Sequence, residues 1–154
     1  MLLRCSRTSI DQTLIHLRQA GQRNQECVVL WLGKRQASHI DLLYCYKPPQ
    51  RAEADQFYIP PEGMTELQSK LRAERLMVAA QVHSHPEDAF HSKADDRWAI
   101  IRHEGALSLV VPRFASDTFI NNFLDQTKVY RFSNRATWDE VPKLQVTQTC
   151  LQII

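Results

Sequence analysis

Residues 76–86 read Leu76-Met77-Val78-Ala79-Ala80-Gln81-Val82-His83-Ser84-His85-Pro86. The apolar run from Leu76 to Val82 predicts a buried strand. Two histidines therefore stand at the C-terminal end of that strand, where the sheet holds side chains rigidly. Because alternate residues of an extended segment point the same way, we expect His83 and His85 to face one pocket while Ser84 points elsewhere.

A second polar stretch follows after a short loop and reads Ser92-Lys93-Ala94-Asp95. Asp95 adds a carboxylate to the two imidazoles, and three protein ligands leave a tetrahedral zinc ion one open position, as catalytic zinc requires. Imidazole and carboxylate together favour zinc over magnesium or calcium. Ser92 is a suitable N-cap for a helix running to about His103, which places Asp95 in its first turn. Asp96 stays a rival for the third ligand.

The rest of the chain predicts a mixed sheet with helices packed against it, an α+β fold in one domain spanning residues 1–154. The length suffices for one hydrophobic core and is too short for two. Apolar runs, helical spacing and turn residues define the elements. These are a helix at 9–20 with Ser9 as N-cap, strands at 27–33 and 38–46 joined by a turn at 33–35, a helix at 61–74, a strand at 107–111, a short helix at 117–124, a strand at 128–132 and an edge strand at 144–154.

Composition argues against several classes of function. The formal net charge of +2 is too small to indicate binding to a nucleic acid or a membrane surface. Basic runs with interleaved aromatic residues are absent from the sequence, and no apolar stretch approaches the roughly 18 residues of a membrane span. The four cysteines form no Cys-x-x-Cys pair and no secretory signal is visible, so we expect a reducing compartment, the cytoplasm.

Hydrolysis at a zinc site also needs a group that moves protons. Zinc lowers the pKa of a bound water from about 16 to about 7, but a side chain must still take the water's proton and pass it to a leaving amine. Glu26 directly precedes the buried strand at 27–33. A carboxylate at the entry to a buried strand is costly unless it has a bonding partner or a functional role. Glu87 and Asp88 are closer to the histidines in sequence, but loop carboxylates after a proline are usually solvated. We therefore predict Glu26 as the general base and acid.

These stretches together resemble the signature of the JAMM, or MPN+, zinc metalloproteases. The shared features are a glutamate before an apolar strand that ends in glycine, a His-Ser-His-Pro sequence and a Ser-x-x-Asp sequence, here at 26–33, 83–86 and 92–95. The resemblance covers roughly residues 9–112. It implies that the ligands of a zinc ion are His83, His85 and Asp95. It also implies that Glu26 is the general base and acid and that Ser92 hydrogen-bonds the developing oxyanion.

The same resemblance implies a sheet with flanking helices, similar to the fold of cytidine deaminases. It further implies hydrolysis of the peptide or isopeptide bond after the C-terminal tail of ubiquitin or a ubiquitin-like protein. Lacking room for the insertions of eukaryotic relatives, the chain is similar to minimal prokaryotic members. Such proteins occur in bacterial ubiquitin-like conjugation systems, some linked to phage defence, so E1- and E2-like enzymes are expected partners.

Some alternatives stay open at this point. The spacer from His85 to Ser92 is one residue shorter than is usual in the family, which is why Asp96 remains a rival ligand. His91, next to Ser92, is a further candidate for the site. Two other functions are consistent with the sequence. One is the release of amino acids or peptides from a carrier protein by the same chemistry, and the other is a non-catalytic scaffold.

Overall fold

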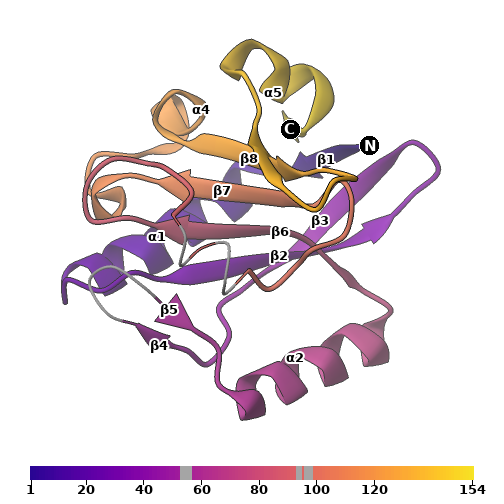
Figure 1. Ribbon diagram of the computed structural model, residues 1–154, viewed down its shortest axis with the longest axis horizontal. Helices are drawn as coiled ribbons and strands as arrows, with labels where there is room; N and C mark the ends of the chain where they lie inside the picture. Colours follow the sequence, from indigo (N-terminus) through magenta and orange to yellow (C-terminus); the bar gives the residue numbers. More distant parts are fainter. Residues whose placement is uncertain (53–56, 93–94, 96–98) are drawn as a thin grey trace.

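The computed structural model describes residues 1–52, 57–92, 95 and 99–154 of the chain. Within these residues, eight strands form one mixed sheet in the order β10-β1-β3-β2-β6-β7-β8-β9 (Figure 1), and two short strands, β4 and β5, pair separately. The strands are β1 Leu2–Cys5, β2 Val28–Arg35, β3 His39–Tyr46, β4 Arg51–Ala52, β5 Phe57–Tyr58, β6 Met77–Ser84, β7 Leu107–Val111, β8 Lys128–Phe132, β9 Trp138–Glu140 and β10 Leu151–Ile153.

The helices lie around this sheet, which confirms the predicted mixed α+β fold (Figure 1). Among the described residues they are α1 Arg7–Gly21, α2 Pro61–Glu74, α4 Phe123–Gln126 and α5 Lys143–Thr149, with single 3₁₀ turns at Arg113–Ala115 and Ile120–Asn122. Each of these helices is too short or too polar to traverse a lipid bilayer.

The two faces of the central strands form two separate parts of the core. Strand β2 begins with six buried residues, which follows from its unbroken apolar run and its place between β3 and β6. On one face, Val29 and Trp31 pack with α1. On the other, Val28 and Leu30 pack with Leu67 of α2. Both faces of β2 are therefore covered, and the strand supplies a rigid support for residues at its ends.

The first helix begins earlier than predicted. Its N-cap is Ser6, whose hydroxyl accepts a hydrogen bond of 3.1 Å from the N–H of Ser9, so Ser9 lies in the first turn. The helix starts this early because the preceding strand β1, which the sequence analysis missed, ends at Cys5 and is anchored there by buried side chains. The apolar face of the helix is as predicted, with Ile10 and Leu14 buried.

The expected turn at 33–35 is wrong. Strand β2 continues to Arg35, and the hairpin is closed by a hydrogen bond of 2.7 Å from Gln36 N–H to His39 O. Gly33 serves a different purpose, since a Cβ atom there would come 2.5 Å from the carbonyl oxygen of Asp41. Glycine therefore permits a close approach of β2 and β3 beside a shift in their register.

The predicted helix from Ser92 to His103 is wrong from residue 99 onward. Residues 99–106 form no helix, because their backbone groups bond to the sheet instead. The N–H of Ile100 donates to the side-chain oxygen of Gln81 at 3.1 Å, and Gly105 N–H donates to Phe132 O at 2.9 Å. Tertiary contacts thus outweigh the local helical spacing.

Near the C-terminus, two further expectations need correction. The short helix predicted at 117–124 is displaced and lies at 120–126. The edge strand predicted at 144–154 is confirmed only for β10, which pairs in parallel with β1 at the edge of the sheet. Residues 143–149 form helix α5, which buries Val146 and leaves Leu144 87% exposed. The apolar alternation was misleading because Leu144 contributes nothing to the core.

Candidate metal centre

Two histidines and an aspartate meet where β6 ends. His83 is the penultimate residue of β6 and His85 directly follows the strand. The Nε2 atoms of His83 and His85 lie 3.2 and 3.0 Å from Oδ2 of Asp95. The three ligand atoms lie within 4.8 Å of one another, and all three side chains are buried. In the part of the chain that the structure describes, no other group of His, Cys, Asp and Glu is arranged to hold a metal ion. The rival Asp96 lies outside the described residues.

A local hydrogen-bond pair presents Asp95 to the histidines. The N–H of Asp95 donates to the hydroxyl of Ser92 at 3.0 Å, and the N–H of Ser92 donates to Oδ2 of Asp95 at 2.8 Å. This reciprocal arrangement is a capping box, which the Ser-x-x-Asp spacing makes possible. Ser92 therefore fixes the carboxylate. Since a hydroxyl oxygen accepts while its proton remains free to donate, the predicted oxyanion role of Ser92 is compatible with this bond.

The electrostatics of the site keep Asp95 ionised. Burial on its own raises the pKa of this carboxyl, but the electrostatic interaction with His83 and hydrogen bonds from His83, His85 and the N–H of Ser92 outweigh that effect. The net result is a pKa well below the usual range of aspartate. A carboxylate binds a metal ion in its ionised form, which is the form that the site favours for Asp95.

The donor set fits a divalent metal ion. Two imidazoles and one carboxylate converge in a buried site, and three protein ligands are the number typical of catalytic rather than structural zinc sites. Imidazole nitrogen suits zinc and other transition metals better than magnesium or calcium. His83, His85 and Asp95 would hold the ion, and one coordination position would stay open to solvent or substrate.

The strand pairing places Glu26 beside this group. Strands β2 and β6 are antiparallel with Val28 opposite His83. A hydrogen bond of 3.1 Å from Ser84 N–H to the carbonyl of Cys27 keeps this register for one further pair. Extending the register by one more residue, beyond the ends of both strands, sets Glu26 opposite His85. Cross-strand neighbours point to the same face of a sheet. Glu26 is only 1% exposed, so its side chain is buried, and the extended register assigns it to the face of the sheet that carries the histidines.

Two side chains hold the backbone that carries Glu26. On one side, Cys27 N–H donates to the hydroxyl of Ser84 at 3.1 Å. On the other side, the amide of Gln50 accepts from Val28 N–H at 2.9 Å and donates to Val28 O at 3.0 Å. Gln50 follows two prolines that cannot donate to a ladder, so its side chain takes the place of a neighbouring strand. The start of β2 is thereby fixed on both edges.

Aromatic side chains line the site, and the sequence analysis missed most of them. The ring of Phe90 meets His85 edge-on with centroids 4.7 Å apart, although Phe90 is 51% exposed. His91 lies 6.2 Å from His83, measured between ring centroids, and 5.2 Å from both Tyr130 and Trp138. The structure thus brings His91 next to the ligands. Tyr130 and Trp138 come from distant strands, and no local pattern could have pointed to them.

A cavity of about 690 Å³ opens beside the start of β2. Glu26 and Cys27 form part of its wall, together with residues from the segment 46–52 that leads from β3 to β4. Burial raises the pKa of the Cys27 thiol to about 11, and the charges of Lys47 and Arg23 act in the opposite direction. Both basic side chains also line the cavity.

Comparisons with known proteins agree with this geometry. Residues 10–115 match the prokaryotic homologues of the JAB domain. A protein of Sinorhizobium fredii (strain NGR234) described as probable metalloprotease y4jG is 35% identical over 146 residues, which cover 92% of this chain and 88% of that protein.

Two solved structures share the fold. Protein DSY2949 from Desulfitobacterium hafniense, determined in solution, has a TM-score of 0.69 and 18% identity, and the match covers 100% of this chain and 93% of that one. AF2198, a JAB1/MPN domain protein from Archaeoglobus fulgidus, has a TM-score of 0.53 and 17% identity, with 100% and 99% covered. At such identities the likeness concerns the fold alone.

The matched region includes Glu26 and the buried group of His83, His85 and Asp95. It spans most of the chain, and the relative described as a metalloprotease matches nearly all of it. These findings support a metal-dependent hydrolase. The chain belongs to the family of prokaryotic homologues of the JAB domain.

Proposed function

We propose that this protein is a zinc-dependent isopeptidase or peptidase that hydrolyses the amide bond after the C-terminal tail of a ubiquitin-like protein. The observation that carries the proposal is the buried group of His83, His85 and Asp95 beside the start of β2, where Glu26 stands. Family membership supports the same chemistry. The zinc ion and the ubiquitin-like substrate are parts of the proposal.

The zinc ion, Glu26 and Ser92 each have a separate role in the proposed reaction. When bound, zinc supplies a Lewis acid that polarises the substrate carbonyl and acidifies a water molecule. Glu26 takes the proton from the attacking water and passes it to the nitrogen of the leaving amine. Ser92 donates a hydrogen bond from its hydroxyl to the developing oxyanion. Such a donor typically lowers the barrier by about 3 to 4 kcal/mol. The capping box leaves that proton available while it holds Asp95 in place.

The substrate tail would reach the site in extended form. A cavity of about 690 Å³ adjoins Glu26, which gives room for several residues of a peptide. Extended peptides commonly bind along a strand edge, where main-chain hydrogen bonds give affinity, and β4, which among the described residues pairs only with β5, lines this cavity. The exposed ring of Phe90 stands beside His85 and offers an apolar contact at the mouth of the site. We further expect E1- or E2-like enzymes as pathway partners and a cytoplasmic location, which suits the four free cysteines.

The test is a cleavage assay with the zinc-loaded protein. Its substrates are a panel of ubiquitin-like proteins, each fused through its C-terminal tail to a reporter, and a set of short peptides. We expect cleavage directly after the tail of at least one ubiquitin-like protein and loss of cleavage after chelation. Cleavage of short peptides alone would contradict this proposal and favour the alternative function, release of amino acids or peptides from a carrier protein. A zinc-loaded protein that cleaves neither kind of substrate would also contradict the proposal and favour a non-catalytic scaffold.

A further inference from the structure

Three consecutive residues after β7 have left-handed backbone. The φ angles of Arg113, Phe114 and Ala115 are 52°, 52° and 59°, and none of the three is glycine. Side chains make this conformation unfavourable, so consecutive residues rarely adopt it. Such backbone persists only where its surroundings fix it, and it concentrates at functional sites. Residues 113–115 thus form a left-handed turn.

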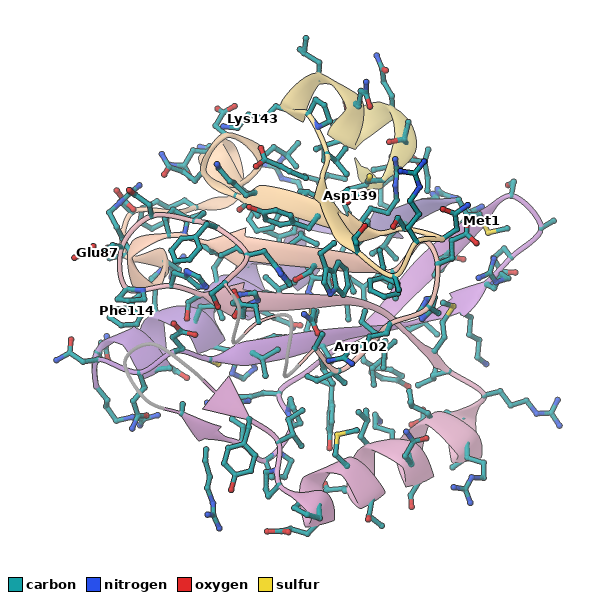
Figure 2. All side chains as sticks on the ribbon, viewed as in Figure 1. Met1, Glu87, Arg102, Phe114, Asp139 and Lys143 are labelled. Atoms are coloured by element: carbon teal, nitrogen blue, oxygen red, sulfur yellow. The ribbon has the colours of Figure 1, made fainter. Side chains whose placement is uncertain are left out.

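The left-handed turn holds the backbone of a metal ligand. His85 directly follows the last paired residue of β6, and its N–H still donates to the carbonyl of Val111 in β7 at 2.9 Å, so the sheet holds its N–H but not its carbonyl. Phe114 N–H donates to the carbonyl of His85 at 2.8 Å, and Arg113 N–H donates to the carbonyl of Glu87 at 2.8 Å. Figure 2 shows Glu87 and Phe114 together at the end of the sheet. These two hydrogen bonds hold the backbone at the carbonyl of His85 and at the carbonyl of Glu87, two residues further along.

Helix α1 in turn holds the left-handed turn. The guanidinium of Arg18 donates from Nε to Ala115 O at 3.2 Å and from Nη2 to Thr118 O at 3.3 Å. The last residue of the helix is Gly21, where a Cβ atom would come 2.4 Å from Cβ of Phe114. Because that Cβ is attached directly to the backbone, the turn itself would have to move. Glycine is therefore needed for this contact.

We propose that Arg18 and Gly21 are positioning residues for the metal ligand His85 and act through the left-handed turn. Neither residue belongs to the group of metal ligands, and both lie on α1. A metal site tolerates little displacement of its ligands, so a shift at Phe114 that moves the carbonyl of His85 also misplaces its imidazole. The proposal rests on the metal site of the proposed function and not on its substrate.

The test measures the zinc affinity of the full chain by competition with a chromophoric chelator. We expect Arg18→Ala and Gly21→Ala each to weaken zinc binding at least ten-fold. Arg18→Lys, which keeps a cation but loses the two-pronged donor, should recover part of the affinity. Should Gly21→Ala fail to fold, Arg18→Ala still provides the measurement.

Two control variants separate positioning from a general loss of stability. Val146→Ala removes buried apolar volume in α5, which packs against β8 and β10, and should lower the melting temperature without changing zinc affinity. Arg7→Ala removes an exposed cation from the same helix as Arg18 and should change neither property.

Zinc affinity at the wild-type value in a folded Arg18→Ala variant or in a folded Gly21→Ala variant would overturn the positioning role of that residue. A wild-type protein that binds zinc but cleaves no substrate would refute the proposed function and leave this inference standing. A wild-type protein with no affinity for zinc would overturn both.

Discussion

The backbone N–H of Cys27 donates a hydrogen bond of 3.1 Å to the hydroxyl of Ser84. Cys27 directly follows Glu26, and Ser84 lies between His83 and His85. This contact between β6 and the start of β2 therefore links the proposed proton-transfer residue to the proposed metal ligands. The middle residue of the His-Ser-His sequence therefore binds the segment that follows Glu26, and it does not belong to the candidate group of metal ligands.

Removing the Ser84 hydroxyl should destabilise the protein. In Ser84→Ala the buried N–H of Cys27 loses its acceptor, which typically costs about 1–3 kcal/mol. We expect that loss in urea unfolding, together with a lower kcat and an unchanged zinc content. Ser84→Thr keeps a hydroxyl and should retain most of the stability. The matched control is Ser69→Ala on the exposed side of α2, and equal stability of Ser84→Ala and this control would contradict the role.

The side chain of Gln50 should protect the start of β2. Its amide makes two hydrogen bonds with the backbone of Val28, at 2.9 and 3.0 Å. Gln50→Met keeps the length of the side chain but removes both bonds, so the amide hydrogen of Val28 should exchange at least ten-fold faster. Hydrogen exchange followed by NMR measures this directly. Gln68→Met, at an exposed position of α2, should leave the exchange unchanged, and the same result in Gln50→Met would refute the prediction.

Zinc should stabilise the folded protein through Asp95. A ligand that binds only the folded state adds about 2.7 kcal/mol when its free concentration is one hundred times its Kd. We therefore expect zinc to raise the melting temperature and a chelator to reverse the rise. Asp95→Asn removes the carboxylate that lies within 3.2 Å of both imidazoles, and it should abolish the effect of zinc. Asp11→Asn, on the exposed face of α1, is the control and should respond as wild type does.

Alkaline pH should weaken the fold through its buried thiols. Burial raises the pKa of Cys27 to about 11 and that of Cys5 to about 12, from 9.0. Above pH 9 the unfolded chain loses these protons while the folded protein keeps them. The free energy of unfolding should then fall by up to about 1.4 kcal/mol per pH unit and thiol until the folded thiols ionise. Urea unfolding at pH 8 and 10.5 measures the loss, which should be smaller in the double variant Cys5→Ala, Cys27→Ala. An equal loss in both proteins would contradict the assignment.

Much of the metal centre could be predicted from sequence because its geometry is local. Two histidines on alternate positions at a strand end must face the same side, and a Ser-x-x-Asp sequence forms its capping box within four residues. The structure accordingly brings His83, His85 and Asp95 together. The strong apolar runs of β2 and β6 also fixed the core of the sheet, since strands buried on both faces have few polar interruptions.

Features that depend on distant contacts could not be predicted. The helix expected up to His103 fails because Ile100 bonds to Gln81 of β6, a pairing invisible in local spacing. Strand β1 is short and needs β3 and β10 as partners before it becomes a strand. Tyr130 and Trp138 reach His91 only because β8 and β9 follow β7 in the sheet.

The central claim concerns Glu26 and is tested most directly by one pair of measurements on Glu26→Gln. This substitution keeps the size of the side chain and removes its ability to take a proton. Zinc content and cleavage of a ubiquitin-like fusion are measured on the same sample. We predict one zinc ion per chain, as in the wild-type protein, and a loss of cleavage of at least a thousand-fold. Wild-type cleavage in the zinc-loaded variant would contradict the assigned role of this carboxylate.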